Sequence, residues 1–101
     1  MLNVDRKLLT IITESVLEAE LCKMLKSLGA SGYTVTNARG SGSRGQRNAG
    51  WSASSNVRIE VVCSAELAAR IAKVADEKYS DDYAMILMEQ DVRVQRADKF
   101  S

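Results

Sequence analysis

Short runs of β-branched and apolar residues alternate with two helix-like segments along this 101-residue chain, and their order restricts the folds it can adopt. Lys7 to Thr13 and Val57 to Cys63 are too short and too rich in Val, Ile and Thr for helices, so they predict buried strands. The segment Gly32 to Ala38 has the same character, and Ala84 to Met88 and Val92 to Val94 predict two more strands near the C-terminus.

Two segments repeat apolar residues at the spacing of a helix. In the first, Ser15 and Glu18 form a capping-box pattern, and Gly29 is a favoured left-handed terminator. In the second, Ser64 is a candidate cap for a helix from Ala65 to about Tyr79. The apolar positions are Leu17, Leu21, Met24, Leu25 and Leu28 in the first segment, and Leu67, Ala68, Ile71, Val74 and Ala75 in the second.

The order strand, helix, strand, strand, helix, strand with right-handed crossovers predicts an α+β fold of the ferredoxin-like split βαβ type. A chain of this length encloses one hydrophobic core, so we expect a single domain over residues 1–101. Two helices on one face of an antiparallel sheet leave its other face uncovered. We therefore expect the protein to oligomerise through that face.

Composition argues against several functional classes. The chain has no histidine, which disfavours acid–base and zinc chemistry, and we predict neither a metal site nor an enzyme. Cys22 and Cys63 are isolated and fall on predicted core-facing positions, as expected for buried, reduced thiols of a cytoplasmic protein. No apolar run approaches the roughly 18 residues of a membrane helix, and residues 1–7 do not have the pattern of a signal peptide.

Charge is segregated although the net charge is only +1. From Leu21 to Ile59 there is no Asp or Glu, and this stretch carries six cations. Its second half, Arg39 to Asn56, loses all periodicity and holds four of the six glycines, which predicts a long functional loop. The basic stretch favours an anionic ligand or partner. Its cations are Lys23, Lys26, Arg39, Arg44, Arg47 and Arg58.

The loop contains a G-x-G-x-x-G pattern at residues 40–45, with Glu60 about 20 residues later. A dinucleotide-binding fold needs that pattern to open a helix, and the residues that follow have no helical periodicity, so we reject that interpretation. Glycines nevertheless let backbone amides approach an anion, and Arg44 with Arg47 can place guanidinium groups on phosphate oxygens. A merely solvated loop and a segment binding single-stranded nucleic acid remain alternatives, although Trp51 alone is available there for base stacking.

Three motifs within this framework resemble those of PII-like signalling proteins, in the branch associated with bicarbonate transporters and carboxysomes. They are GYTV at Gly32 to Val35, GxGSRxxR at Gly40 to Arg47 and KYxxDYA at Lys78 to Ala84. The resemblance extends over nearly the whole chain.

The resemblance implies a non-enzymatic homotrimer with an adenine nucleotide in each cleft between subunits. A flexible T-loop, here about residues 39–56, would respond to that ligand. The positions that the resemblance assigns to nucleotide binding are Gly32, Tyr33, Thr34, Gly40, Gly42, Arg44, Arg47, Val62, Ile86 and Arg93.

Departures from the family pattern refine the expected ligand. Other PII proteins carry GDGK before the fourth strand, where this chain reads SDDYAMI. We therefore expect ADP or AMP, or cyclic AMP, rather than ATP. Met85 stands where transporter-associated relatives have glycine. The cysteine-flanked C-terminal extension of some relatives is missing, and for this reason we predict no redox switch.

Partners follow from the resemblance too. It implies bicarbonate as a co-ligand and a bicarbonate transporter or carboxysome-associated protein as partner, with no nucleic acid and no membrane insertion. Two other classes stay open at this point. One is a small protein that binds single-stranded nucleic acid through the basic loop, and the other is a structural trimer related to metal-tolerance proteins of the same fold.

Overall fold

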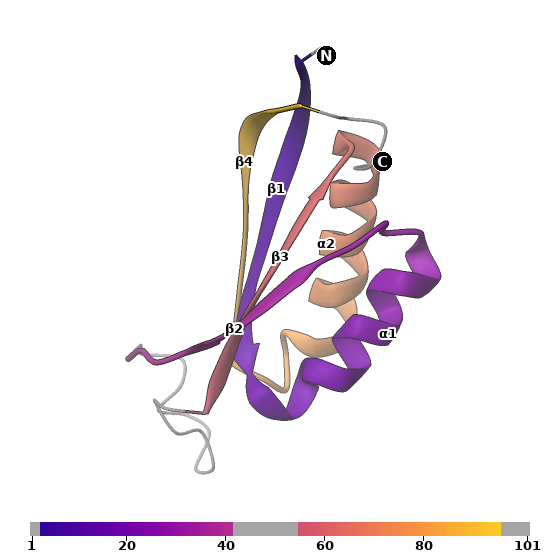
Figure 1. Cartoon of the computed structure of the whole chain (residues 1–101). Coiled ribbons are helices and arrows are strands. Elements are labelled where there is room, and N and C mark those ends of the chain that lie inside the picture. The colour runs from indigo at the N-terminus through magenta and orange to yellow at the C-terminus, as the bar shows by residue number, and fades with distance from the viewer. Residues whose placement is uncertain (1–2, 42–54, 96–101) are drawn as a thin grey trace.

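The computed structural model describes residues 3–41 and 55–95, which form a four-stranded antiparallel sheet and two helices. Both helices lie on the same side of the sheet (Figure 1). The strand order is β2-β3-β1-β4, so β1 and β3 occupy the centre. This confirms the predicted ferredoxin-like α+β fold. The elements are β1 (Asn3–Glu14), the 3-10 helix η1 (Ser15–Leu17), α1 (Glu18–Leu28), β2 (Thr34–Ala38), β3 (Asn56–Cys63), α2 (Ala65–Tyr79) and β4 (Met85–Gln95).

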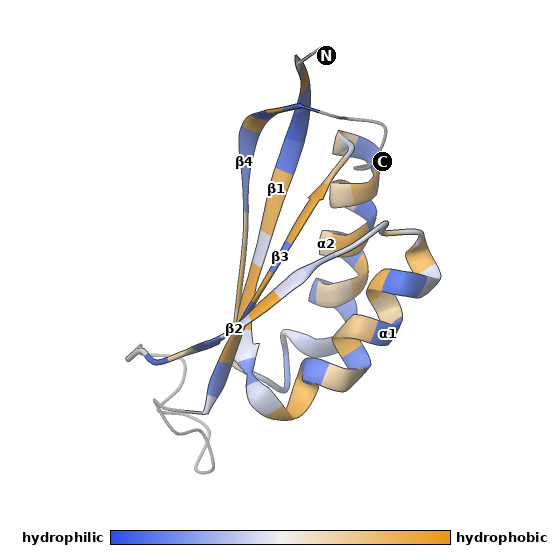
Figure 2. Ribbon diagram, viewed as in Figure 1, coloured by the Kyte–Doolittle hydropathy of each residue, from blue (hydrophilic) through white to orange (hydrophobic). Residues whose placement is uncertain are grey.

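The hydrophobic core lies between the helices and the odd-numbered positions of the two central strands. Hydrophobic residues appear along the middle of these strands and at intervals on both helices (Figure 2). On β3 the predicted alternation is confirmed, because all four inward positions are at most 1% exposed. Burial of each such side chain contributes roughly 1.5 to 3 kcal/mol. The core strand positions are Leu9 and Ile11 on β1, and Val57, Ile59, Val61 and Cys63 on β3.

Two of the predicted helix ends are confirmed. Gly29 follows α1 with φ of 101°, in the left-handed region that glycine adopts without strain. The Ser64 hydroxyl accepts a hydrogen bond of 3.1 Å from the backbone N–H of Leu67, which caps α2.

The capping box predicted at Ser15 is wrong. The chain leaves β1 through one turn of 3-10 helix, and neither Glu14 nor Leu17, which precede η1 and α1, makes a side-chain cap. The backbone N–H of Ser15 instead donates a 2.9 Å hydrogen bond to the carbonyl of Ser55, just before β3. A tertiary contact is therefore present where the sequence predicted a local cap.

The outer part of the sheet also differs from the prediction. One continuous strand, β4, replaces the two short strands expected at Ala84 to Met88 and Val92 to Val94. It pairs with β1 from Thr13 opposite Met85 to Asn3 opposite Gln95, so β1 begins four residues earlier than predicted. Polar residues in the middle of β4 are tolerated because it is an edge strand and exposed there. At the other edge, β2 begins two residues later than predicted.

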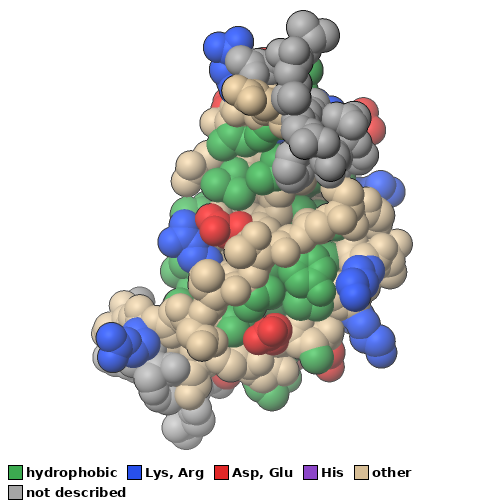
Figure 3. Space-filling view, viewed as in Figure 1, with side chains coloured by type: hydrophobic (Ala, Val, Ile, Leu, Met, Phe, Trp, Pro, Cys, Tyr) green, Lys and Arg blue, Asp and Glu red, His purple; other side chains and the backbone are tan. Residues whose placement is uncertain are grey.

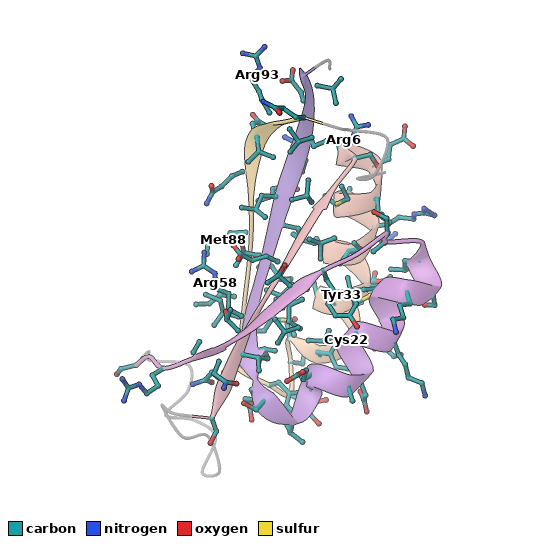
Figure 4. The ribbon with its side chains drawn as sticks, viewed as in Figure 1. Arg6, Cys22, Tyr33, Arg58, Met88 and Arg93 are labelled. Carbon is teal, nitrogen blue, oxygen red and sulfur yellow. The ribbon has the colours of Figure 1, made fainter. Side chains whose placement is uncertain are left out.

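The sheet face without helices carries the even-numbered side chains of the central strands. It also carries Ile86 and Met88 of β4, which are 54% and 41% exposed. Arg58 and Glu60 form an ion pair of 3.2 Å on this face. Arg58 and Met88 both project away from the helices (Figure 4). Exposed apolar side chains next to one another are typical of an association surface. We call this side the open face.

The two cysteines differ in exposure. Cys63 is fully buried, as predicted, and burial, reinforced by the nearby Glu89, raises the pKa of its thiol. Cys22 on α1 is only half-buried, so the prediction of two buried thiols is wrong for this residue. Its side chain lies at the rim of the core because the helix turns position 22 away from the stripe formed by Leu21 and Leu25.

Two threonines of β1 are buried on opposite faces of the sheet. Thr13 faces the helices, and its hydroxyl donates a 2.6 Å hydrogen bond to the carbonyl of Ala84. Thr10 lies on the open face between Glu60 and Met88. It is 1% exposed, and its hydroxyl has no hydrogen-bond partner in residues 3–41 and 55–95.

These threonines give a matched test of the packing. Thr13→Val should lower the free energy of unfolding by about 1 to 3 kcal/mol, because the buried carbonyl of Ala84 loses its donor. Thr10→Val should leave it unchanged or raise it by up to about 1 kcal/mol, because a hydroxyl without a partner is removed. Urea unfolding at one fixed protein concentration measures both. Equal losses in the two variants would contradict the assignment.

Candidate ligand-binding site

A hollow of about 340 Å³ lies where β2 begins, beside the two central strands. It collects four of the residues predicted from the sequence to bind a nucleotide, although they come from two separate segments of the chain. Those four are Gly32, Tyr33, Thr34 and Val62, and the hollow is completed by Leu8 and Glu60.

The strand register brings the walls of the hollow together. Leu8 of β1 is directly opposite Val62 of β3, and Glu60 of β3 is directly opposite Thr34 of β2. These four positions alternate with the buried core positions of their strands, so they share the open face. The same alternation that fills the core therefore places an apolar pair beside a polar pair.

Tyr33 supports the hollow from the side of the helices. It is half-buried and packs against the core, and it lies close to Cys22 of α1 (Figure 4). The pKa of the Tyr33 hydroxyl is raised, mainly by a hydrogen bond with the Cys22 side chain and to a smaller extent by partial burial. The tyrosine therefore stays neutral at physiological pH and offers the hollow a ring and not a charge.

The lining suits a flat, partly apolar group that carries hydrogen-bond donors. Leu8 and Val62 provide apolar walls, the Thr34 hydroxyl both donates and accepts, and the Glu60 carboxylate accepts. Glu60 is paired with Arg58, and its side chain keeps 28% exposure. Its remaining lone pairs can accept from amino or hydroxyl groups of a ligand.

The other described candidates lie elsewhere. Gly40 follows the end of β2, Ile86 lies on β4 opposite Ile12, and Arg93 lies near the far end of β4. Arg93 is 4.0 Å from Asp5 and is largely exposed. Asp5 of β1 lies at the end of the sheet near Arg93, and Glu14 of β1 lies at the end near Gly40. These two positions are nine residues apart, which is about 30 Å along a strand. One chain therefore does not bring Gly40 and Arg93 to the same small ligand.

Gly42, Arg44 and Arg47 lie outside the described residues. The described cations of the basic stretch do not form the single basic surface expected from the sequence. Lys23 and Lys26 lie on α1, Arg39 directly follows β2, and Arg58 lies on the open face with Glu60 as partner. The space-filling view shows Lys and Arg side chains in separate groups (Figure 3).

The sequence analysis missed Leu8 as a candidate and considered Glu60 only within the rejected dinucleotide-binding pattern. The signal was present in the alternation on β3, because Glu60 and Val62 share a face, and Val62 was already a candidate. Placing Leu8 beside them needed the register between β1 and β3, which the sequence alone does not specify.

Among residues 3–41 and 55–95, no group of three or more His, Cys, Asp or Glu side chains is placed to hold a metal ion. Neither helix in this part of the chain is long and apolar enough to cross a membrane.

Comparison with known proteins identifies the family. Residues 6–99 match the family described as nitrogen regulatory protein P-II. A protein of Thermus thermophilus assigned as a PII-like signaling protein is 44% identical over 100% of both chains, with a TM-score of 0.84. CPII of Thiomonas intermedia, bound to ADP, AMP and acetate, is 22% identical over 99% of this chain and 98% of that one, with a TM-score of 0.83.

A more distant structure extends the same comparison. GlnK of B. subtilis in complex with ATP is 18% identical over 85% of this chain and 82% of that one, with a TM-score of 0.57. PII proteins are trimeric regulators and not enzymes. The family match over 94 residues, the sheet order and the two helices on one face together confirm the resemblance inferred from the sequence. The chain belongs to the PII family of regulatory proteins.

Proposed function

We propose that this protein is a non-enzymatic, cytoplasmic regulator that senses adenine nucleotides, with ADP or AMP as its ligand, at clefts between the subunits of a homotrimer. The observation that carries the proposal is the hollow on the open face, which gathers Gly32, Tyr33, Thr34 and Val62. The adenine base or the ribose would lie against Leu8 and Val62. Glu60 would accept hydrogen bonds from the amino group or the sugar hydroxyls.

The distance between the candidate residues Gly40 and Arg93 supports a site that is shared between subunits. Because Gly40 and Arg93 mark opposite ends of one subunit, they can serve the same ligand only if different copies supply them. Trimers are usual in this family. A cleft that combines one copy's hollow with a second copy's strand ends would accommodate the base and the phosphates separately.

The proposed signal is transmitted by the loop of residues 39–56. Phosphate groups would neutralise Arg44 and Arg47, which orders the loop and changes the surface offered to a partner. The ligand can shift this equilibrium only by its differential affinity for the two loop states, typically about 1 to 3 kcal/mol. The regulated process we propose is inorganic-carbon or energy metabolism, with a bicarbonate transporter or carboxysome-associated protein as partner.

Solved relatives support this choice of ligand. Structures of CPII contain ADP with bicarbonate, and ADP and AMP with acetate. We therefore propose bicarbonate as a co-ligand here. The nucleic-acid alternative gains no support from Lys23 and Lys26 on α1 or from Arg58 on the open face, because these cations do not lie on one face of the subunit.

Calorimetric titration with AMP, ADP, ATP, cyclic AMP and adenosine, each with and without bicarbonate, tests the proposal. We expect saturable binding of ADP and AMP, tighter than that of ATP. Absence of binding by every adenine nucleotide would show that the proposed function is wrong.

Two kinds of variant should distinguish binding of the base from binding of the phosphates. Arg44→Ala or Arg47→Ala should weaken ADP and AMP by on the order of tenfold to a hundredfold and leave adenosine unchanged, because each charge-assisted hydrogen bond is worth about 1.5 to 3 kcal/mol. Val62→Phe should fill the hollow and weaken adenosine and ADP alike. The same calorimetry measures both. Arginine variants that bind ADP like the parent would exclude these residues from the site.

The open face should hold the trimer together. Met88→Asp places a charge among exposed apolar side chains and should shift the protein toward monomers at micromolar concentration. Val16→Asp is the control, because Val16 is 72% exposed and belongs to η1, away from that face. Multi-angle light scattering gives the masses. A parent that is monomeric at the same concentration would contradict a site shared between subunits.

A further inference from the structure

Glu60 is the charged group of the hollow, and Arg58 holds it. Of the described residues that line the hollow, Glu60 alone carries a charge. The Nη2 atom of Arg58 donates a hydrogen bond of 3.2 Å to the Oε2 atom of Glu60, and the two groups form an ion pair. Arg58 lies two positions earlier on β3, and its side chain points away from the helices (Figure 4). A ligand in the hollow therefore meets a carboxylate that is already paired on one side.

This ion pair uses one of the two carboxylate oxygens. Within residues 3–41 and 55–95, the Oε1 atom of Glu60 has no hydrogen-bond partner. The strand register places Thr34 of β2 directly opposite Glu60, and the hydroxyl of Thr34 can donate or accept a hydrogen bond. The polar edge of the hollow therefore offers one free carboxylate oxygen beside one hydroxyl group.

The two purine bases of nucleotides present different groups to such an edge. Adenine has one amino group next to a ring nitrogen that accepts a hydrogen bond. Guanine has a ring N–H and an amino group side by side, and these two donors match both oxygens of a free carboxylate. One oxygen beside a hydroxyl suits adenine, because Oε1 of Glu60 accepts from the amino group and Thr34 donates to the ring nitrogen. Guanine needs Oε2 as well, and Arg58 occupies that oxygen.

We infer that Arg58 is a positioning residue that makes the hollow prefer adenine over guanine, because it engages Oε2 of Glu60 and leaves only Oε1 for the base. The inference rests on the proposed function and adds that the base, and not the ribose, lies next to Glu60. Arg58 acts through Glu60 and touches no ligand itself. The side chains of Arg58 and Glu60 are 45% and 28% exposed, and ion pairs with such exposure contribute little to stability. Base selection can therefore be measured separately from folding.

Calorimetry with ADP and GDP tests the inference. These ligands carry the same ribose and phosphates, so the ratio of their affinities depends on the base. We expect the parent to bind ADP more tightly than GDP, and Arg58→Met to lower this ratio at least about fivefold, because Oε2 becomes free to accept. Arg58→Lys should keep the parent ratio, because an ammonium group also bonds to one carboxylate oxygen. The control is Arg70→Met, which removes an exposed cation of α2 on the other side of the sheet and should not change the ratio.

A second background shows whether Arg58 acts through Glu60. In the Glu60→Ala variant, the additional change Arg58→Met should leave the ratio of ADP to GDP affinity unchanged, because the carboxylate that Arg58 positions is absent. An equal fall of the ratio in both backgrounds would mean that Arg58 acts on the base without Glu60, and the inference would be wrong.

A further variant guards against misfolding. Arg58→Thr also removes the guanidinium and introduces a residue that suits a strand, so it should lower the ratio as Arg58→Met does. Melting temperatures and trimer mass identify folded variants. If the parent binds ADP without preference over GDP, or if neither variant lowers the ratio, the role of Arg58 is wrong and the proposed function stands. If the parent binds no adenine nucleotide, both proposals are wrong.

Discussion

The double pairing of β1 holds this subunit together. β1 pairs with β3 from Lys7 to Glu14 and with β4 from Asn3 to Thr13, so the first strand organises both halves of the sheet. Its odd positions from Leu9 to Thr13 enter the core and its even positions face the other side of the sheet, which fixes the alternation of both neighbours. The register that buries Ile11 against the helices also places Leu8 beside Val62 in the hollow. Core and candidate site therefore depend on one set of backbone hydrogen bonds.

Much of this architecture could be predicted because the physical signals are local. A short β-branched run, an apolar stripe, the serine cap of α2 and the left-handed glycine after α1 each act within a few residues. The errors occurred where distant residues decide the outcome. Ser15 looks like a helix cap, yet its backbone bonds to Ser55. The polar middle of β4 looks like a break, yet the ladder to β1 runs through it.

The same distinction applies to the candidate site. Gly32 to Thr34 could be chosen from the GYTV motif, and Val62 from the resemblance to PII-like proteins. Glu60 and Leu8 could not, since their proximity is a property of register. The distance between Gly40 and Arg93 is also known only from the three-dimensional structure. The sequence alone does not reveal that one subunit cannot bring these two residues to the same ligand.

The pairing of Asn3 with Gln95 has a consequence for how the protein folds. These partners are 92 positions apart (95 minus 3), so the ladder between β1 and β4 closes almost the largest loop that the chain allows. Contacts of such long range slow folding, because chain entropy is lost before the contacts form. β1 can pair with β3 and pack against the helices before β4 is added, so its edge toward β4 is the last part of the strand to gain a partner. We therefore expect the pairing of β1 with β4 to be a late step of folding, slower than the formation of the helices.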